Sequence, residues 1–132
     1  MTRINAGVPP ATLCDQHLIA EYRELPRMVA FAHTCTLEVA MAHPTFTLGT
    51  GHMKSVVRFG AYLSFRHKWI VAEMRCRQFE PTMPAVTTEQ FPAWAREFPS
   101  DEWLAAARII VEQRIRDRIA TMKKPARWFV PL

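Results

Sequence analysis

The chain is organised around residues 15–27, which read Asp15-Gln16-His17-Leu18-Ile19-Ala20-Glu21-Tyr22-Arg23-Glu24-Leu25-Pro26-Arg27. Their spacing predicts a helix with two different faces. Apolar side chains recur at intervals of three and four residues and form a stripe for the core: Leu18, Tyr22, Leu25 and Val29. Because proline has no backbone N–H to donate, Pro26 predicts a kink or break in this helix.

A second face of the same helix carries one acid among cations. His17, Ala20, Glu24 and Arg27 recur at helical spacing, and Arg23 precedes Arg27 by one turn. Charged faces of helices are most often only solvated, and surface Arg–Glu pairs are weak. This face alone therefore does not establish a site.

Length and composition favour one domain, residues 1–132, with a single core, because 49% of the residues are hydrophobic. No apolar run approaches the roughly 18 residues of a membrane span, and the polar start does not resemble a secretory signal. The three cysteines are widely spaced and predict reduced, buried thiols in a cytoplasmic protein rather than disulfides or a zinc site. The net charge of +5 favours a polyanionic partner.

The rest of the chain predicts an all-α fold of three main helices joined by irregular loops. The first helix is expected from about Thr12, a possible N-cap, to about Cys35. The segment 36–44 is ambiguous, and residues 44–53 are expected to form a loop. No strand precedes the Gly49-Thr50-Gly51 sequence and no third glycine follows it, so a nucleotide-binding loop is excluded.

Two further helices follow from their patterns. The second helix is expected to bury a stripe that consists of Tyr62, Phe65, Trp69, Ala72, Cys76 and Phe79. Four prolines in residues 80–100 predict a long irregular segment that covers the core. Ser100 is the expected N-cap of a third helix to about Met122, whose buried stripe is Leu104, Val111, Ile115, Ile119 and Met122. On this helix Arg114 and Arg118 share one side, and Arg116 can pair with Glu112.

Several stretches together resemble the phage-type pyrimidine-dimer DNA glycosylase/AP lyase family, also called dimer-specific endonuclease V. The resemblance rests on Thr2-Arg3-Ile4-Asn5, Asp15-Gln16-His17-Leu18 and the unbroken run Ala20 to Arg27. It continues through Pro44-Thr45-Phe46, Leu48-Gly49 and Gly51-His52, and reaches the basic third helix and Trp128. The resemblance implies a repair enzyme that acts as a monomer on damaged double-stranded DNA without a metal or cofactor.

The resemblance also implies roles for individual residues. The terminal amine of Thr2, exposed after removal of Met1, is the expected nucleophile, and Glu24 is the expected catalytic acid. Arg3, His17, Arg23 and Arg27 match positions that grip phosphates around the lesion. Arg114 and Arg118 align with basic residues of the family's DNA-binding face. The alternative for Glu24 is a structural pair with Arg27, and Glu21 is expected to be structural.

The expected chemistry has a physical basis in the terminal amine. An imine route needs a neutral amine at the C1′ carbon of the sugar. An α-amino group has a pKa of about 7.7–8.0 against about 10.4 for lysine, so roughly one in ten termini is already neutral at pH 7. Nearby cations such as Arg3 and Arg23 disfavour the protonated amine further. His43 and His52 with His17 have the residue types of a metal site, but their spacing matches no known one.

Three features depart from the family pattern. The segment between Asn5 and Asp15 is one residue longer and contains Pro9-Pro10, and the tail after Trp128 is less aromatic. The segment 33–43 has no Lys or Arg where the family has a strongly basic loop. We therefore expect weaker non-specific DNA binding, with a shallower dependence on salt, than in the phage enzyme.

Other functions remain open on the sequence alone. The same chemistry could act on other damaged bases or on abasic sites. A basic helical DNA-binding module without catalysis would keep the arginines and would not need a free Thr2 amine. A small structural or adaptor protein would show no salt-dependent affinity for DNA.

Overall fold

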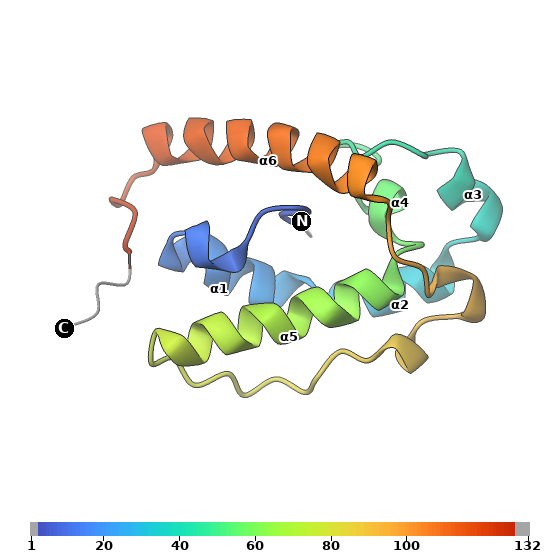
Figure 1. The fold of residues 1–132 in the computed structure, drawn as a ribbon, viewed down its shortest axis with the longest axis horizontal. Helices are drawn as coiled ribbons and strands as arrows, with labels where there is room; N and C mark the ends of the chain where they lie inside the picture. The colour runs from blue at the N-terminus through green and yellow to red at the C-terminus, as the bar shows by residue number, and fades with distance from the viewer. Residues whose placement is uncertain (1–2, 129–132) are drawn as a thin grey trace.

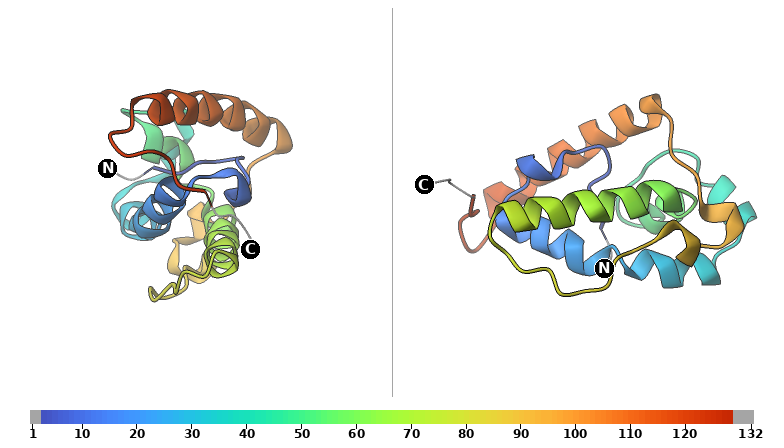
Figure 2. Two further views of the ribbon diagram at one scale, coloured as in Figure 1. Left: turned by 90° about the vertical axis from the view of Figure 1, so that its left-hand side faces the viewer. Right: turned by 60° about the horizontal axis from the view of Figure 1, so that its bottom comes forward.

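Two long helices, α5 (Gly60–Cys76) and α6 (Asp101–Thr121), lie on opposite sides of the N-terminal segment and α1 (Asp15–Glu24) (Figure 1; Figure 2). The computed structural model describes residues 3–128. Over this range the chain forms six α-helices and three short 3₁₀ helices, together with one isolated bridge between Phe59 and Arg96. The prediction of an all-α fold is confirmed.

The first predicted helix is two helices, with the break at Pro26. Helix α1 ends at Glu24, and α2 (Arg27–Thr34) begins directly after the proline. Around the break the N–H of Met28 donates to the carbonyl of Leu25 at 3.0 Å, which is a tighter turn than an α-helix makes. The predicted start at Thr12 is wrong. Thr12 ends the 3₁₀ helix η1 (Pro10–Thr12), and α1 begins only at Asp15 because Leu13 and Cys14 are both extended.

Two short helices lie in segments for which the sequence predicted no helix. Helix α3 (Leu37–Met41) starts where the Thr36 hydroxyl accepts the N–H of Val39 at 3.2 Å. Helix α4 (His52–Val56) begins inside the expected loop 44–53, directly after Gly51. Gly51 has a φ of +88°, a conformation that glycine adopts without strain and that lets the chain turn into α4.

The buried face of α5 differs from the predicted one. Phe65 and Trp69 are 52% and 39% exposed, and Ala72 and Cys76 are also exposed. The helix instead buries a face that contains Tyr62, Leu63, Ser64, Arg66, His67, Ile70 and Met74. Periodicity failed because this face carries polar side chains with partners: Arg66 pairs with Glu21, and the Ser64 hydroxyl donates to the carbonyl of Val86.

The segment between α5 and α6 is mostly irregular, as predicted, with only the 3₁₀ helices η2 (Thr88–Gln90) and η3 (Ala93–Ala95). It covers the core with Val86, Phe91 and Ala95, which are all buried. The Ser100 hydroxyl caps α6 by accepting the N–H of Trp103 at 3.1 Å, which confirms the predicted start of this helix.

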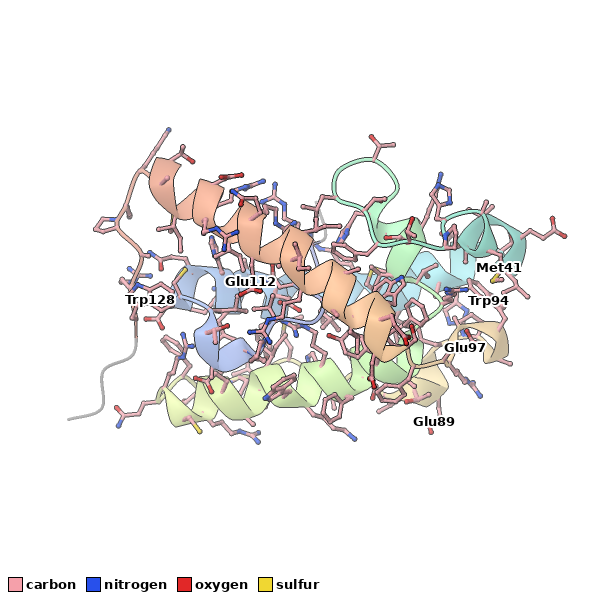
Figure 3. All side chains as sticks on the ribbon, turned by 45° about the horizontal axis from the view of Figure 1, so that its top comes forward. Met41, Glu89, Trp94, Glu97, Glu112 and Trp128 are labelled. Carbon is pink, nitrogen blue, oxygen red and sulfur yellow. The ribbon has the colours of Figure 1, made fainter. Side chains whose placement is uncertain are left out.

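Helix α6 buries a narrower stripe than predicted. Val111 and Ala107 are fully buried, whereas Leu104, Ile115, Ile119 and Met122 are half-buried. The predicted pair of Arg116 with Glu112 is not formed: Glu112 pairs with Arg108, and Arg116 donates to the side chain of Gln113. Glu112 is labelled beside α6 in Figure 3.

The N-terminal segment runs between the helices and is buried from Ile4 to Ala6. Gly7 has a φ of +78°, and a Cβ atom there would lie 2.4 Å from the carbonyl oxygen of Leu104 on α6. The absence of a side chain therefore allows this segment to approach the backbone of α6 closely. The Arg66 guanidinium donates to the carbonyl of Val8 at 2.8 Å and holds the end of the segment.

The C-terminal end of the described chain is tied to α1. The N–H of Asp15 donates to the carbonyl of Arg127 at 2.7 Å, and Gln16 bonds to Pro125 and Arg127 through its side-chain amide. Trp128, which follows Arg127, lies at the opposite end of the molecule from Met41 (Figure 3).

The three cysteines differ in burial. Cys14, Cys35 and Cys76 are free thiols, but only Cys14 is buried, because Cys76 lies on the exposed face of α5. The prediction of three buried thiols is therefore wrong for Cys35 and Cys76.

No helix within residues 3–128 combines the length and apolar character that crossing a membrane requires.

Candidate functional site

A small cleft opens where the N-terminal segment, α1 and α6 meet. It encloses about 60 Å³ and is lined by Arg3, Asn5, His17, Ala20, Glu21, Glu24, Arg114, Ile115 and Arg118. Pockets that enclose small molecules are much larger, typically about 300–1,000 Å³. The cleft therefore suits groups on the surface of a larger partner better than an enclosed ligand.

The fold brings together five of the eight residues that the sequence nominated for a site. Arg3, His17, Glu24, Arg114 and Arg118 all line this cleft, although they come from opposite ends of the chain. Arg23 and Arg27 do not line it and are exposed on α1 and at the start of α2. Thr2, the predicted nucleophile, lies outside the described residues.

Three arginines give the site a concentrated positive charge. Arg3, Arg114 and Arg118 also line an adjoining cleft of about 190 Å³, which Leu48 and Gly49 of the loop before α4 and His52 of α4 complete. Partial burial and the charges of Arg3 and Arg118 lower the pKa of Arg114 to about 10, so it is still a cation at neutral pH. Guanidinium groups crowded in this way suit phosphate oxygens, which relieve the repulsion between them.

The two carboxylates that line the cleft differ in burial and in hydrogen bonding. Glu21 is buried, and both of its oxygens accept hydrogen bonds from Arg66, with Asn5 adding a third at 2.7 Å. Glu24 is half-buried, and within residues 3–128 it makes no hydrogen bond or ion pair. The pair of Glu24 with Arg27, considered as the structural alternative, is thus not formed. Glu24 is the carboxylate of the cleft that a partner can reach.

His17 contributes a neutral imidazole to the cleft. Burial is the main cause that lowers its pKa below 6.5, and the charges of Arg114, Arg118 and Arg3 lower it further. Its Nδ1 atom is buried and has no hydrogen-bond partner among the described residues. An imidazole with an uncommitted ring nitrogen can bond to an oxygen of a bound group.

Asn5 connects the two sides of the cleft, a role that the sequence did not assign to it. Its amide nitrogen donates to Glu21 of α1, and its oxygen accepts a 2.7 Å hydrogen bond from Arg114 of α6. Since Asn5 and Arg114 are 109 residues apart, no local pattern could have indicated this contact. The only signal in the sequence was the presence of Asn5 in the Thr2-Arg3-Ile4-Asn5 stretch.

Two of the three histidines considered for a metal site, His43 and His52, have other partners. His52 accepts the N–H of Ile4 at its Nε2 atom and donates from Nδ1 to the carbonyl of Thr47, while His43 bonds to the carbonyl of Val39. Among residues 3–128, no three His, Cys, Asp or Glu side chains are grouped as metal ligands.

Comparison with known protein families identifies the chain. Residues 1–87 match the family model described as pyrimidine dimer DNA glycosylase. The match includes the N-terminal segment, α1 and His52, and it ends before α6, which supplies Arg114 and Arg118. Because it spans well over half of the 132 residues, the chain belongs to the pyrimidine dimer DNA glycosylase family.

Proposed function

We propose that the protein is a bifunctional repair enzyme that removes UV-induced pyrimidine dimers from duplex DNA and then cuts the strand as an AP lyase. Membership of the family supports the glycosylase activity and the DNA substrate. The lyase step is our inference from the chemistry that the residues of the cleft can perform.

The proposed nucleophile is the α-amino group of Thr2 after removal of Met1. The neutral amine attacks C1′ of a nucleotide of the dimer, the glycosidic C–N bond breaks, and an imine to the opened sugar follows. A terminal amine suits this step because its pKa is about 2.5 below that of lysine. The next residue, Arg3, lines the cleft that contains Glu24, which supports the proposal that the reaction takes place there.

The proposed acid–base group is Glu24. Its carboxylate stabilises the positive charge on the sugar and the imine, and it assists removal of a proton from C2′ while the C3′–O bond breaks. The observation that carries this assignment is the contrast with Glu21. Arg66 and Asn5 occupy the oxygens of Glu21, whereas those of Glu24 have no partner within the described residues.

The arginines are proposed to hold the backbone of the damaged strand. Arg3, Arg114 and Arg118 line the cleft with His17, which supports the proposal that they contact phosphates close to the reacting sugar. Arg23 and Arg27 are exposed outside the cleft and are proposed to contact phosphates further along the strand. A damaged base pair is the easiest place to open a duplex, which gives the enzyme access to the sugar.

We further propose that the enzyme acts in the cytoplasm as a monomer, that residues 1–132 form one domain, and that no metal or cofactor is needed. The imine route needs only the terminal amine and a carboxylate, which supports the last point. Sedimentation at working concentration tests the monomer. Activity after treatment with a chelator tests the independence from metal.

The experiment compares wild type with Glu24→Gln and Glu112→Gln on a duplex that contains one cyclobutane thymine dimer. Glu112 is a matched control because it is a glutamate on the exposed side of α6, paired only with Arg108. We expect Glu24→Gln to lose about 100-fold or more in base release and strand cleavage, since general acid–base groups contribute about 10²–10⁴-fold. Binding of the duplex and the activity of Glu112→Gln stay within about twofold of wild type.

The outcomes separate the competing functions. Unchanged turnover in Glu24→Gln would assign the acid to another residue. Cleavage of an abasic duplex but not of the dimer duplex by wild type would keep the lyase and reject the dimer as substrate. Salt-dependent binding without cleavage of either duplex would leave a DNA-binding module.

A further inference from the structure

The N-terminal segment is fixed by side chains from four different helices. The N–H of Ile4 donates to His52 of α4, Asn5 bonds to Glu21 of α1 and Arg114 of α6, and the N–H of Gly7 donates to the Tyr62 hydroxyl of α5 at 3.0 Å. Of these contacts, the one to His52 lies closest along the chain to Thr2.

His52 is held in one orientation and one tautomer. Its ring is 4% exposed and packs edge-on against Phe46, with 5.2 Å between the ring centroids. Nδ1 lies 2.8 Å from the carbonyl of Thr47, which can only accept, so Nδ1 carries the proton. Nε2 is then the acceptor for the N–H of Ile4 at 2.9 Å, and both ring nitrogens are occupied.

We propose that neutral His52 is a positioning residue of the proposed reaction, which aligns the terminal amine by holding the backbone N–H of Ile4. This inference rests on the proposed function, because it needs the Thr2 amine as nucleophile. Geometry matters here, since a displacement of about 1 Å from the reactive position can cost about 100-fold in rate. Alignment of the amine affects the rate of the chemical step, whereas the affinity for DNA depends on the arginines.

The surroundings of His52 keep it neutral. Burial lowers its pKa below 6.5, and Arg114 of α6 and Arg3 of the N-terminal segment act in the same direction. The hydrogen bond to Thr47 and the charge of Glu21 on α1 oppose them without reversing the shift. Protonation would place a second donor against the N–H of Ile4 and break this contact.

The test uses three variants of the full chain. His52→Leu has a similar volume but no acceptor for Ile4, and His52→Gln restores an acceptor. His67→Phe is the matched control, because His67 is a second buried histidine, stacked on Tyr22, and makes no hydrogen bond to the N-terminal segment among the described residues. The measurements are the single-turnover rate of borohydride trapping on an abasic duplex and the affinity for a duplex with a reduced, unreactive abasic site.

We expect His52→Leu to trap about 100-fold more slowly than wild type and His52→Gln to recover to within about tenfold. His67→Phe traps at the wild-type rate, and all variants bind the unreactive duplex within about threefold of wild type. Hydrogen exchange at the Ile4 amide, followed by NMR, shows whether the contact is lost: its protection falls in His52→Leu and returns in His52→Gln.

Failure of this inference and failure of the proposed function give different results. If wild type forms an adduct at Thr2 and His52→Leu, with the Ile4 amide unprotected, traps at the same rate, His52 does not position the amine. If His67→Phe slows trapping as much as His52→Leu, loss of a buried histidine is the cause and the inference is also rejected. If wild type forms no adduct, the proposed function itself fails.

Discussion

At the scale of single residues, the two glutamates of the cleft differ because Arg66 pairs with only one of them, Glu21. Arg66 is fully buried and donates to both oxygens of Glu21, which is 1% exposed. Although burial by itself lowers the pKa of Arg66, the charge of Glu21 raises it above the ordinary value for arginine. The positive charge of Arg66 therefore balances the negative charge of Glu21 within the core. Glu24, one turn later on α1, lines the cleft.

Removing Arg66 should therefore be strongly destabilising. Loss of one partner from a buried ion pair costs about 3–5 kcal/mol, because the other charge stays buried without compensation. We expect Arg66→Met to lower the free energy of unfolding in urea by this amount.

Arg108→Met provides the comparison, since Arg108 pairs with Glu112 on the exposed side of α6. An exposed pair contributes less than about 1 kcal/mol. Equal losses in the two variants would mean that the Arg66–Glu21 pair is not buried as the structure has it.

The sequence could predict part of this arrangement. Glu24 was distinguished from Glu21 through the family resemblance and through the different arcs that the two occupy on α1. The partner of Glu21 could not be predicted, because Arg66 lies 45 residues away and outside the apolar stripe expected for the second helix. Hydrophobic periodicity cannot identify a buried arginine, since it counts only apolar residues as buried.

At the scale of secondary-structure elements, the site depends on α6, which lies after the region that matches the family model. Arg114 and Arg118 are one turn apart and reach the cleft formed by the N-terminal segment and α1. Arg116 lies on another side of the same helix and hydrogen-bonds to Gln113. Only one side of α6 should therefore contact DNA.

Salt dependence can separate the two sides of α6. Each phosphate contact contributes about 0.9 to the slope of log K against log salt concentration. We expect Arg118→Ala to reduce this slope by about 1 and Arg116→Ala to leave it unchanged, in titrations of a duplex oligonucleotide at several salt concentrations. A reduction in Arg116→Ala equal to that in Arg118→Ala would contradict the assignment of the DNA-binding side.

The main elements were predictable, but their faces and short helices were not. The caps and breaks that involve Ser100 and Pro26 act locally, so the sequence indicated them correctly. The exposed face of α5 was predicted to be buried because Phe65 and Trp69 match the spacing of a core stripe. Helices α3 and α4 have five residues each, too few for a periodic pattern to be recognised.

At the scale of the whole molecule, three histidines connect stability to pH. Burial lowers the pKa values of His17, His52 and His67 below 6.5, with further lowering of the first two by nearby arginines. In the unfolded chain these groups take up protons near pH 6.5, whereas in the folded protein they do so only at lower pH. The unfolded state thus binds more protons below pH 6.5, and folding stability falls as the solution becomes acidic.

Calorimetry at a series of pH values should show this loss. We expect the melting temperature to be constant above about pH 7 and to fall from about pH 6.5 downwards, well above the range in which carboxylates titrate, near pH 4. His67→Phe should reduce the slope of stability with pH by up to about 1.4 kcal/mol per pH unit. A melting temperature that rises as the pH is lowered from about 6.5 to 5 would show that the histidines gain protons on folding.

The most direct test of the proposed function is borohydride trapping of wild type on a duplex with one cyclobutane thymine dimer, followed by mass spectrometry of the adduct. The protein must first be shown to begin at Thr2. We predict a covalent adduct whose modified residue is Thr2, because the imine is formed by the terminal amine. An adduct on a lysine, or none from protein that begins at Thr2, would contradict the mechanism.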